Sequence, residues 1–153
     1  MVAGKLFKIV TAGALVMGLG VTLAYASADD AIKGRQGCMK SHGKTIGEMA
    51  AMFKGEKPYD AAAVQAGLAA DDAACADWDK FWGEDAMKGV TLETWAKPEI
   101  WSDAAGFKAA GENYYAKYLA IKATTDEASF KAAFPEYGNG CKGCHEKFRR
   151  PKE

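Results

Sequence analysis

The sequence predicts an all-α fold, an antiparallel four-helix bundle. Three observations lead to this prediction. Apolar residues recur at alternating steps of three and four along most of the chain, which is the spacing of one helix face. The sequence shows no run in which apolar and polar residues alternate strictly, the pattern of a half-buried strand. Glycine and proline stand between helical stretches, where they end one helix and let the chain turn back.

The first two predicted helices are joined by a short turn. The face of the first advances at steps of three and four through Ile32, Arg35, Met39, His42, Ile46, Met49 and Phe53. Gly55 and Pro58 end this helix. The face of the second is formed by Ala61, Val64, Leu68, Cys75, Trp78 and Trp82. Such spacing is typical of the seam between helices in a bundle.

A looser segment, 83–97, separates these helices from the last two. Pro98 starts the third helix at the position proline prefers, and the seam consists of Ala104, Phe107, Gly111, Tyr114, Tyr118 and Ile121. The fourth helix begins near Thr125 as its N-cap, with two acidic residues in its first turn. Its seam is formed by Phe130, Phe134, Tyr137, Cys141, Cys144 and Phe148. Pro135 falls inside this pattern, so we expect a kink or an interruption there.

The N-terminal residues have the pattern of a secretory signal peptide. Two lysines precede an apolar run, 9–24, and small residues follow, with cleavage predicted after Ala28 or after Ala26. The alternative is a retained membrane anchor, but the run is short, rich in glycine and alanine, and ends in a cleavage-like site. We therefore predict a signal peptide over residues 1–28, one helical domain over residues 29–153, and a bacterial periplasmic location.

Charge and length restrict the partners of this domain. Removal of the signal peptide takes 2 of 20 basic residues and leaves 18 against 20 acidic ones. This balance does not favour nucleic acid or an anionic membrane as a partner, and we expect no stable membrane insertion after cleavage. The remaining 125 of 153 residues are enough for one domain with its own core.

Cys141, Cys144 and His145 form a CxxCH motif, which is typical of c-type haem attachment. Two thiols on one helical turn can add to the two vinyl groups of one porphyrin, and the imidazole that follows can bind the iron. Gly140 and Gly143 have no side chains to obstruct the flat macrocycle. A zinc half-site would need a second ligand pair at similar spacing, and a redox CxxC would need a βαβ setting; the sequence shows neither. The predicted cofactor is one haem c.

The other two cysteines are expected to meet. If the first two helices pair antiparallel around the turn at residues 55–57, Cys38 and Cys75 lie at the same height on neighbouring helices. In an oxidising compartment a disulfide is the first hypothesis, and two buried free thiols are the alternative. The disulfide would stabilise the fold by about 3–4 kcal/mol in the chain-entropy description.

Together these features resemble the class II c-type cytochromes, the cytochrome c′ family, over nearly all of the mature chain. The most specific likeness is the CxxCH motif with the following residues 146–149, and residues 30–36 resemble the family's first-helix opening. The resemblance implies a haem inside the bundle, attached to the fourth helix, with its other face against the first. It also implies redox proteins of the periplasm as partners and a homodimer through the first two helices.

Met39 occupies the position that separates two kinds of family member. In high-spin members the distal face is apolar and the iron is five-coordinate, whereas in low-spin members a first-helix methionine binds the iron. The run Met39-Lys40 with Gly43 resembles the low-spin members, although some five-coordinate members also carry methionine here. Methionine at seam spacing is also a common core residue.

Two polar residues share this face of the first helix. Arg35 is a charge on an apolar seam, where a haem propionate would be a bidentate partner; the alternative is a head group that reaches solvent. His42, one turn from Met39, is expected at the surface or near a propionate rather than on the iron. Arg149, one turn after His145, is expected to flank the imidazole or to cap the helix.

The predicted function is to carry single electrons, with the iron held by His145 and Met39. The protein is then not an enzyme. The alternative is a five-coordinate cytochrome c′ that binds diatomic gases such as nitric oxide or carbon monoxide. A peroxidase-like enzyme would need a distal acid–base pair, and His42 is the only histidine besides His145.

Overall fold

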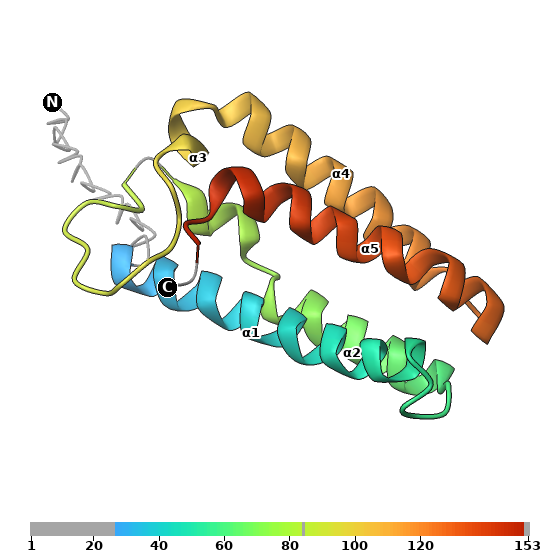
Figure 1. Cartoon of the computed structure of the whole chain (residues 1–153). Coiled ribbons are helices and arrows are strands. Elements are labelled where there is room, and N and C mark those ends of the chain that lie inside the picture. Colours follow the sequence, from blue (N-terminus) through green and yellow to red (C-terminus); the bar gives the residue numbers. More distant parts are fainter. Residues whose placement is uncertain (1–26, 84, 152–153) are drawn as a thin grey trace, which may run out of the picture.

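The computed structural model describes residues 27–83 and 85–151, and the regular elements in this part of the chain are helical. The elements are α1 (Ala28–Phe53), α2 (Ala61–Ala74), the 3₁₀ helix η1 (Trp78–Trp82), α3 (Glu99–Ser102), α4 (Ala104–Lys122) and α5 (Glu127–Phe148). The four long helices form the predicted bundle (Figure 1). All of the predicted signal peptide except Ser27 and Ala28 lies outside the described residues.

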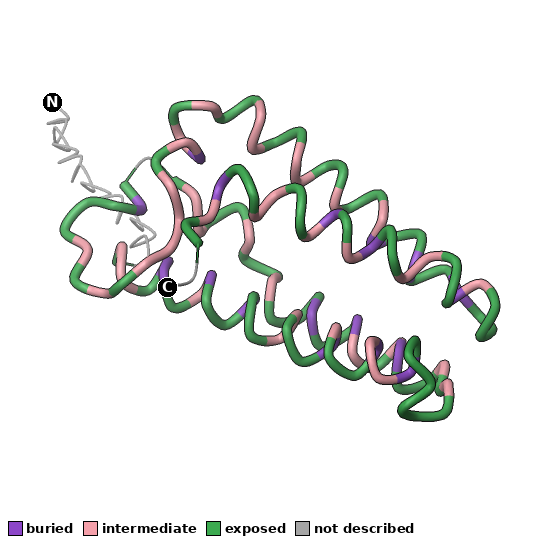
Figure 2. Tube along the Cα trace, viewed as in Figure 1, coloured by how far each residue is buried: buried purple, intermediate pink, exposed green. Residues whose placement is uncertain are grey.

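The helices pack as two pairs. α1 packs mainly on α2, and α4 mainly on α5, while α1 meets α5 along only a short stretch. Buried positions occur on all four long helices, but on α4 they are confined to its last turns (Figure 2). Among the described residues, no helix is both long and apolar enough to cross a lipid bilayer.

α1 starts with a capping box. The Ser27 hydroxyl accepts from the Asp30 backbone N–H at 3.2 Å, and the Asp30 carboxylate accepts from the Ser27 backbone N–H at 3.2 Å. The acidic side chains of the first turn also suit the positive end of the helix dipole. As predicted, the helix ends before Gly55, whose φ of 75° is in the left-handed region that glycine adopts readily.

α2 is shorter than predicted. It was expected to carry Trp78 and Trp82, but it ends at Ala74 with Cys75 as its C-cap, and the two tryptophans lie in η1. The physical reason lies outside the helix. The ring of Trp82 packs 4.9 Å from that of Phe107 on α4, a contact that draws the chain away from the α2 axis.

The third predicted helix is divided in two. It starts after Pro98 as predicted, but α3 ends at Ser102 and α4 begins at Ala104. Asp103 causes the break because its carboxylate accepts from the Gly106 backbone N–H at 3.0 Å and thereby caps α4. The same carboxylate pairs with Lys147 of α5 at 2.5 Å, which ties the start of α4 to the end of α5.

α5 runs through Pro135 without a break, so the expected interruption is wrong. Its N-cap is Asp126, one residue after the predicted Thr125. Proline removes one backbone hydrogen bond and costs about 3 kcal/mol in a helix interior. Fully buried side chains on either side of Pro135, those of Phe130 and Tyr137, hold the helix against the core and offset this cost.

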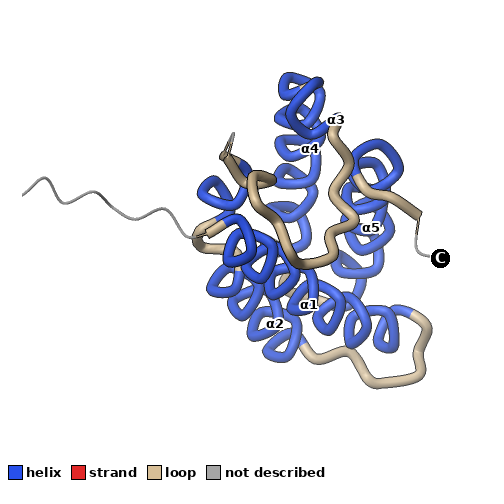
Figure 3. The backbone as a smooth tube through the Cα atoms, turned by 90° about the vertical axis from the view of Figure 1, so that its left-hand side faces the viewer, coloured by secondary structure: helices blue, strands red, loops and turns tan. Residues whose placement is uncertain are grey.

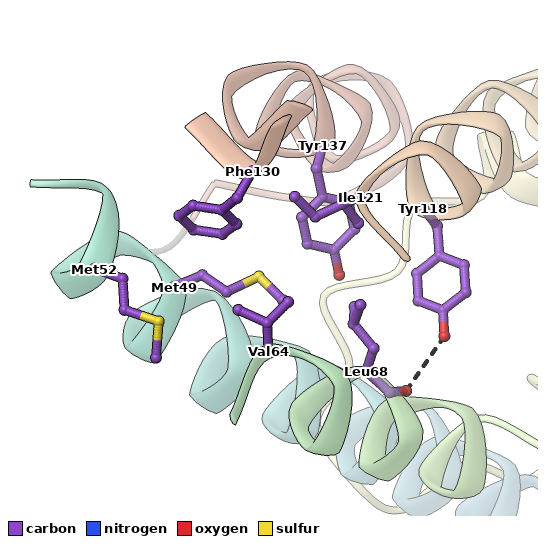
Figure 4. Close-up of a cluster of buried hydrophobic side chains, with 8 residues drawn as sticks. All are labelled: Met49, Met52, Val64, Leu68, Tyr118, Ile121, Phe130 and Tyr137. Carbon is purple, nitrogen blue, oxygen red and sulfur yellow. Dashed lines mark hydrogen bonds between the residues drawn. The ribbon is translucent and has the colours of Figure 1, made fainter. Parts of the chain in front are cut away.

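One hydrophobic cluster fills the half of the bundle that contains the α1–α2 turn (Figure 4). Its members are Met49, Met52, Val64, Leu68, Tyr118, Ile121, Phe130 and Tyr137. The other half contains a cluster of aromatic rings, in which Trp82, Phe107 and Phe148 connect η1, α4 and α5. The CxxCH motif lies on the part of α5 between these two clusters.

A long connection crosses the end of the bundle before α3 (Figure 3). It bonds to the start of α1, where the Asp29 carboxylate accepts from the backbone N–H groups of Thr91 at 2.9 Å and Leu92 at 3.1 Å. It also bonds to the end of α5, where the Lys97 N–H donates to the Phe148 carbonyl at 3.0 Å. The connection therefore joins α1 and α5, which meet along only a short stretch.

Candidate haem-binding site

The CxxCH motif occupies the last turns of α5 with both thiols free. Cys141, Cys144 and His145 are all half-buried. Burial raises the pKa of Cys141 to about 11 and also raises that of Cys144, so both remain protonated thiols at neutral pH. Neither sulfur is in a disulfide, although the Cys141 thiol donates to the Tyr137 carbonyl at 3.5 Å. Both thiols are available to the two vinyl groups of one porphyrin.

His145 has the electrostatic surroundings of a neutral imidazole. Burial lowers the pKa of His145, and the positive charges of Arg149 and His42 lower it further. Neutral imidazole is the form that binds iron. The side chain thus suits an axial ligand.

Arg149 is the C-cap residue of α5, as one of its two expected roles predicted, and its backbone N–H donates to the His145 carbonyl at 3.1 Å. Its guanidinium lies 4.8 Å above the ring of Trp95, and its backbone pairs with Ala96 in an isolated β-bridge. Its charge still reaches His145, as the lowered pKa of that imidazole shows. The end of α5 is thereby held in place directly after the iron-ligand candidate.

The two glycines of the motif differ in their surroundings. A Cβ on Gly140 would lie 3.2 Å from the Tyr114 Cα, so glycine here lets α4 approach α5. That role differs from the predicted one of leaving room for a macrocycle. A Cβ on Gly143 would meet nothing within 4 Å, which agrees with an unobstructed surface beside the thiols.

Arg35 is buried, with 5% of its surface exposed, so the alternative of a solvent-reaching head group is wrong. Its Cζ lies 4.7 Å from the Trp82 ring centroid, and its Nη2 donates to the Ala86 carbonyl at 3.4 Å. Its Nη1 is buried without a hydrogen-bond partner among the described residues. A buried cation with an unused donor fits a carboxylate ligand, and a haem propionate remains the predicted partner.

The register between α1 and α5 follows from two contacts. The His42 Nδ1 is 3.4 Å from the Tyr137 hydroxyl, and the rings of Phe53 and Phe134 are 5.2 Å apart. The helices are antiparallel (Figure 1), so moving toward the start of α1 moves toward the end of α5. At equal rise per residue, the first contact places Met39 opposite Gly140 and the second places it opposite Phe148, so Met39 comes level with the CxxCH motif between them.

Met39 does not belong to the packed core. It is 36% exposed, so the predicted buried seam is wrong at this position, as it is at Phe53, which is 38% exposed. The buried stripe instead passes through Cys38 and Thr45, because these residues engage α2. The Met39 sulfur is therefore not enclosed by protein, and its ligation to iron stays a prediction.

The predicted disulfide between Cys38 and Cys75 is present, with their Cα atoms 4.9 Å apart. His42 beside it is half-buried, so the expectation of a surface position is wrong. Its Nδ1 lies 3.1 Å from a carboxylate oxygen of Asp71, a residue that sequence reasoning missed. The sequence does contain a signal for Asp71, because this residue falls between Leu68 and Cys75 at the spacing of the predicted second seam and is therefore expected to face inward.

A bundle of four long helices with a free CxxCH motif on the last helix defines a c-type haem protein. The family model described as Cytochrome C′ matches residues 30–149, and the chain belongs to the cytochrome c′ family.

Individual relatives agree with this assignment. Over 123 residues the chain is 40% identical to a cytochrome c′ of Rubrivivax gelatinosus, covering 78% of this chain and 94% of the relative. Over 145 residues it is 32% identical to a cytochrome c-556 of Rhodopseudomonas palustris, covering 92% of this chain and 95% of the relative.

Solved structures show the same fold. The crystal structure of the Rubrivivax gelatinosus cytochrome c′ matches with a TM-score of 0.74 and 37% identity, covering 82% of this chain and 99% of that one. A nitric oxide complex of a cytochrome c′ variant from Alcaligenes xylosoxidans matches with a TM-score of 0.70 and 33% identity, covering 83% and 99%. Membership of this family means one covalently attached haem c, and Cys141 and Cys144 are the free thiols that suit the attachment.

Proposed function

We propose that the protein carries single electrons in the periplasm, with its haem iron bound by His145 and Met39. The observation that carries this proposal is the placement of Met39, whose exposed thioether comes level with the CxxCH motif across the α1–α5 register. A thioether is a soft ligand for iron, and a methionine–histidine pair raises the reduction potential.

Each side chain has a separate task in this proposal. When bound, the haem supplies an iron centre that gains and loses one electron. His145 offers a neutral nitrogen on one side, and Met39 offers sulfur on the other. Arg35 holds a propionate with its unpaired Nη1 and thereby orients the macrocycle. We propose no substrate chemistry for these residues.

A shallow hollow beside His145 suits the approach of a redox partner. Four of its lining side chains carry positive charge: Lys97, Lys142, Arg149 and Arg150. Only Glu146 contributes a negative charge to this lining. A basic surface next to the iron ligand steers an acidic partner toward the haem.

Gas binding is the second candidate function. The Alcaligenes xylosoxidans relative has been solved as a nitric oxide complex, and it matches this chain over 83% of its length. In this chain the Met39 side chain is not packed into the core, so it can leave the iron without disturbing the bundle. This candidate requires an open or displaceable distal position.

Optical spectra of the purified ferric and ferrous protein distinguish the two candidates. For an electron carrier we expect a low-spin ferric spectrum with the weak far-red band of a sulfur-to-iron charge transfer. A high-spin ferric spectrum, together with rapid carbon monoxide binding by the ferrous protein, would overturn this function and establish gas binding instead.

We further propose the periplasmic location and a homodimer through α1 and α2. The first rests on the signal-peptide pattern and the second on the family resemblance. Cell fractionation tests the location, and light scattering on the purified holoprotein tests the dimer. A cytoplasmic holoprotein or a monomeric mass would contradict the respective proposal.

A further inference from the structure

His42 lies between a disulfide and a buried carboxylate. Its Nε2 is 3.3 Å from the sulfur of Cys75, and its Nδ1 is 3.1 Å from Oδ2 of Asp71. A sulfur, an imidazole and a carboxylate in this order form the arrangement with which proteins activate a thiol: the imidazole exchanges a proton with sulfur, and the carboxylate orients the imidazole.

Asp71 is built into the fold as the orienting group. It is 1% exposed, and its Oδ1 accepts from the Ser41 hydroxyl at 2.5 Å and from the Thr45 hydroxyl at 3.0 Å. The second oxygen, Oδ2, has no hydrogen-bond partner among the described residues and lies 3.1 Å from His42 Nδ1. It is therefore placed to pair with an imidazolium when one forms.

We propose that Cys38, Cys75, His42 and Asp71 form a thiol–disulfide exchange site that accepts two electrons from a dithiol. The disulfide is the oxidised state of this site. This activity is separate from the proposed electron transfer at the haem and does not depend on it.

The exposure of the two sulfurs determines the order of the steps. Cys38 is 1% exposed, whereas Cys75 is half-buried at the end of α2. A thiolate of the dithiol therefore attacks the Cys75 sulfur, the bond between the two protein sulfurs breaks, and Cys38 leaves as a thiolate. The dithiol's second thiolate then attacks its own sulfur in the mixed disulfide, and Cys75 leaves as a thiolate facing His42.

Protons and electrons balance in this sequence. The dithiol loses two electrons and two protons and becomes a disulfide. Cys38 and Cys75 gain the two electrons. One proton goes to Cys38 and the other to His42, whose nitrogen lies within 4.8 Å of both sulfurs.

Because of its position, the Cys75 thiolate needs His42 to stabilise its negative charge. Cys75 is the C-cap of α2, and the partial negative charge at a helix C-terminus disfavours an anion there. An imidazolium at 3.3 Å reverses this effect. Replacing His42 should therefore raise the pKa of the Cys75 thiol more than the same change would raise it at a site away from a helix C-terminus.

The other titratable groups around His42 do not supply a positive charge that could stabilise the Cys75 thiolate in its place. The titratable groups that face it are Asp71, Asp72 and Cys75 from α2, Tyr114 from α4, and Tyr137 and His145 from α5. Burial raises the pKa of both tyrosines, so their hydroxyls stay neutral.

The test is the pH dependence of Cys75 alkylation in reduced holoprotein. After phosphine reduction, iodoacetamide labelling of Cys75 is followed by peptide mass between pH 5 and pH 10. We expect an apparent thiol pKa below the ordinary value of about 8.5. His42→Gln should raise it by about one unit, so that labelling at pH 7 slows by up to about tenfold.

Two further variants make the test specific. Asp71→Asn should shift the Cys75 profile in the same direction as His42→Gln. Tyr114→Phe is the matched control, because it removes a hydroxyl 3.5 Å from His42 Nδ1 but leaves sulfur, imidazole and carboxylate in place. It should leave the profile unchanged, and circular dichroism reports whether each variant folds.

A wild-type profile centred at or above about 8.5 would overturn the proposal. So would equal profiles in the wild type and a folded His42→Gln variant. If neither His42→Gln nor Asp71→Asn folds, the wild-type profile and the rate of disulfide reduction by dithiothreitol decide alone. A disulfide that resists millimolar dithiothreitol in the folded holoprotein would also contradict the exchange site.

Discussion

The guanidinium of Arg35 lies 4.7 Å from the ring centroid of Trp82, in the interior of the protein. The ring covers one side of the cation and the Ala86 carbonyl accepts one N–H, but Nη1 has no partner among the described residues. The Nη1 of this buried cation is therefore the donor that can bind an anion. Among the described residues, this arrangement points most clearly to an anionic ligand such as a haem propionate.

The first prediction concerns this cation. Arg35→Leu should lower the midpoint potential of the haem, because a nearby positive charge favours the ferrous state. We expect a shift of up to about 60 mV, a tenfold change in a one-electron equilibrium. Arg35→Lys keeps the charge and is the control. Equal potentials in wild type and Arg35→Leu, measured by redox titration, would show that no propionate binds there.

The second prediction concerns Met39. Met39→Ala should turn the ferric protein high-spin, lower its potential and speed carbon monoxide binding by the ferrous protein, because the thioether no longer fills the coordination position. Leu119→Ala is a suitable control, since Leu119 is likewise an exposed apolar residue, at 47%, but lies on α4. Identical spectra for wild type and Met39→Ala would exclude the sulfur from the iron.

The third prediction concerns haem attachment. Acidified organic solvent should leave the haem on the native chain but extract it from a Cys141→Ala, Cys144→Ala double variant, because two thioether bonds no longer hold it. A Cys38→Ala, Cys75→Ala double variant provides the control and should retain its haem. Free extraction from the native chain would contradict covalent attachment.

The fourth prediction separates two glycines of α5. A Cβ at position 140 meets backbone of α4 at 3.2 Å, which cannot yield easily, whereas a Cβ at position 138 meets nothing within 4 Å. We expect Gly140→Ala to destabilise the fold by about 1–3 kcal/mol. Gly138→Ala should instead stabilise it by about 0.5–1 kcal/mol. Denaturant unfolding of the two holoproteins measures both, and equal effects would contradict the close approach of α4.

The fifth prediction is a pH dependence at Asp103. The hydrogen bond from Lys147 and that from the Gly106 backbone hold the pKa of Asp103 below its usual range. A lowered folded-state pKa stabilises the protein above the unfolded value of 3.8, and this contribution is lost as the pH falls through the folded value.

Asp103→Asn tests this dependence. The melting temperature of the wild type should exceed that of the variant at pH 7, and the difference should shrink as the pH falls below about 4. Asp79→Asn, at an exposed aspartate of η1, is the control. A difference that stays constant down to pH 2 would mean that the Asp103 carboxylate charge does not contribute.

Local patterns in the sequence were sufficient for much of this fold. The end of α1 at Gly55 follows from a residue that favours the left-handed region, and the disulfide between Cys38 and Cys75 follows from equal heights on two antiparallel helices. The CxxCH motif predicted a haem protein because the chemistry of attachment needs that spacing, and the family match agrees with it. These predictions depend on neighbours within one element or one hairpin.

What the sequence could not predict depends on contacts between distant elements. α2 ends early because Trp82 finds Phe107 on α4, and α5 continues through Pro135 because the core holds both sides of it. Met39 lies outside the packed seam because its neighbour on the helix bonds to α2. None of these outcomes can be derived from the periodicity of a single helix.

The connection between η1 and α3 has a consequence for the haem. It bonds to α1 through Asp29 and to α5 through Phe148, the two helices expected on opposite sides of the macrocycle. We expect this strap to fix the separation of α1 and α5 at that end of the bundle, whereas the contacts of His42 with Tyr137 and of Phe53 with Phe134 fix it farther along. A single protease cut in this strap would weaken haem binding between α1 and α5. It would leave both helix pairs intact, together with the disulfide between Cys38 and Cys75.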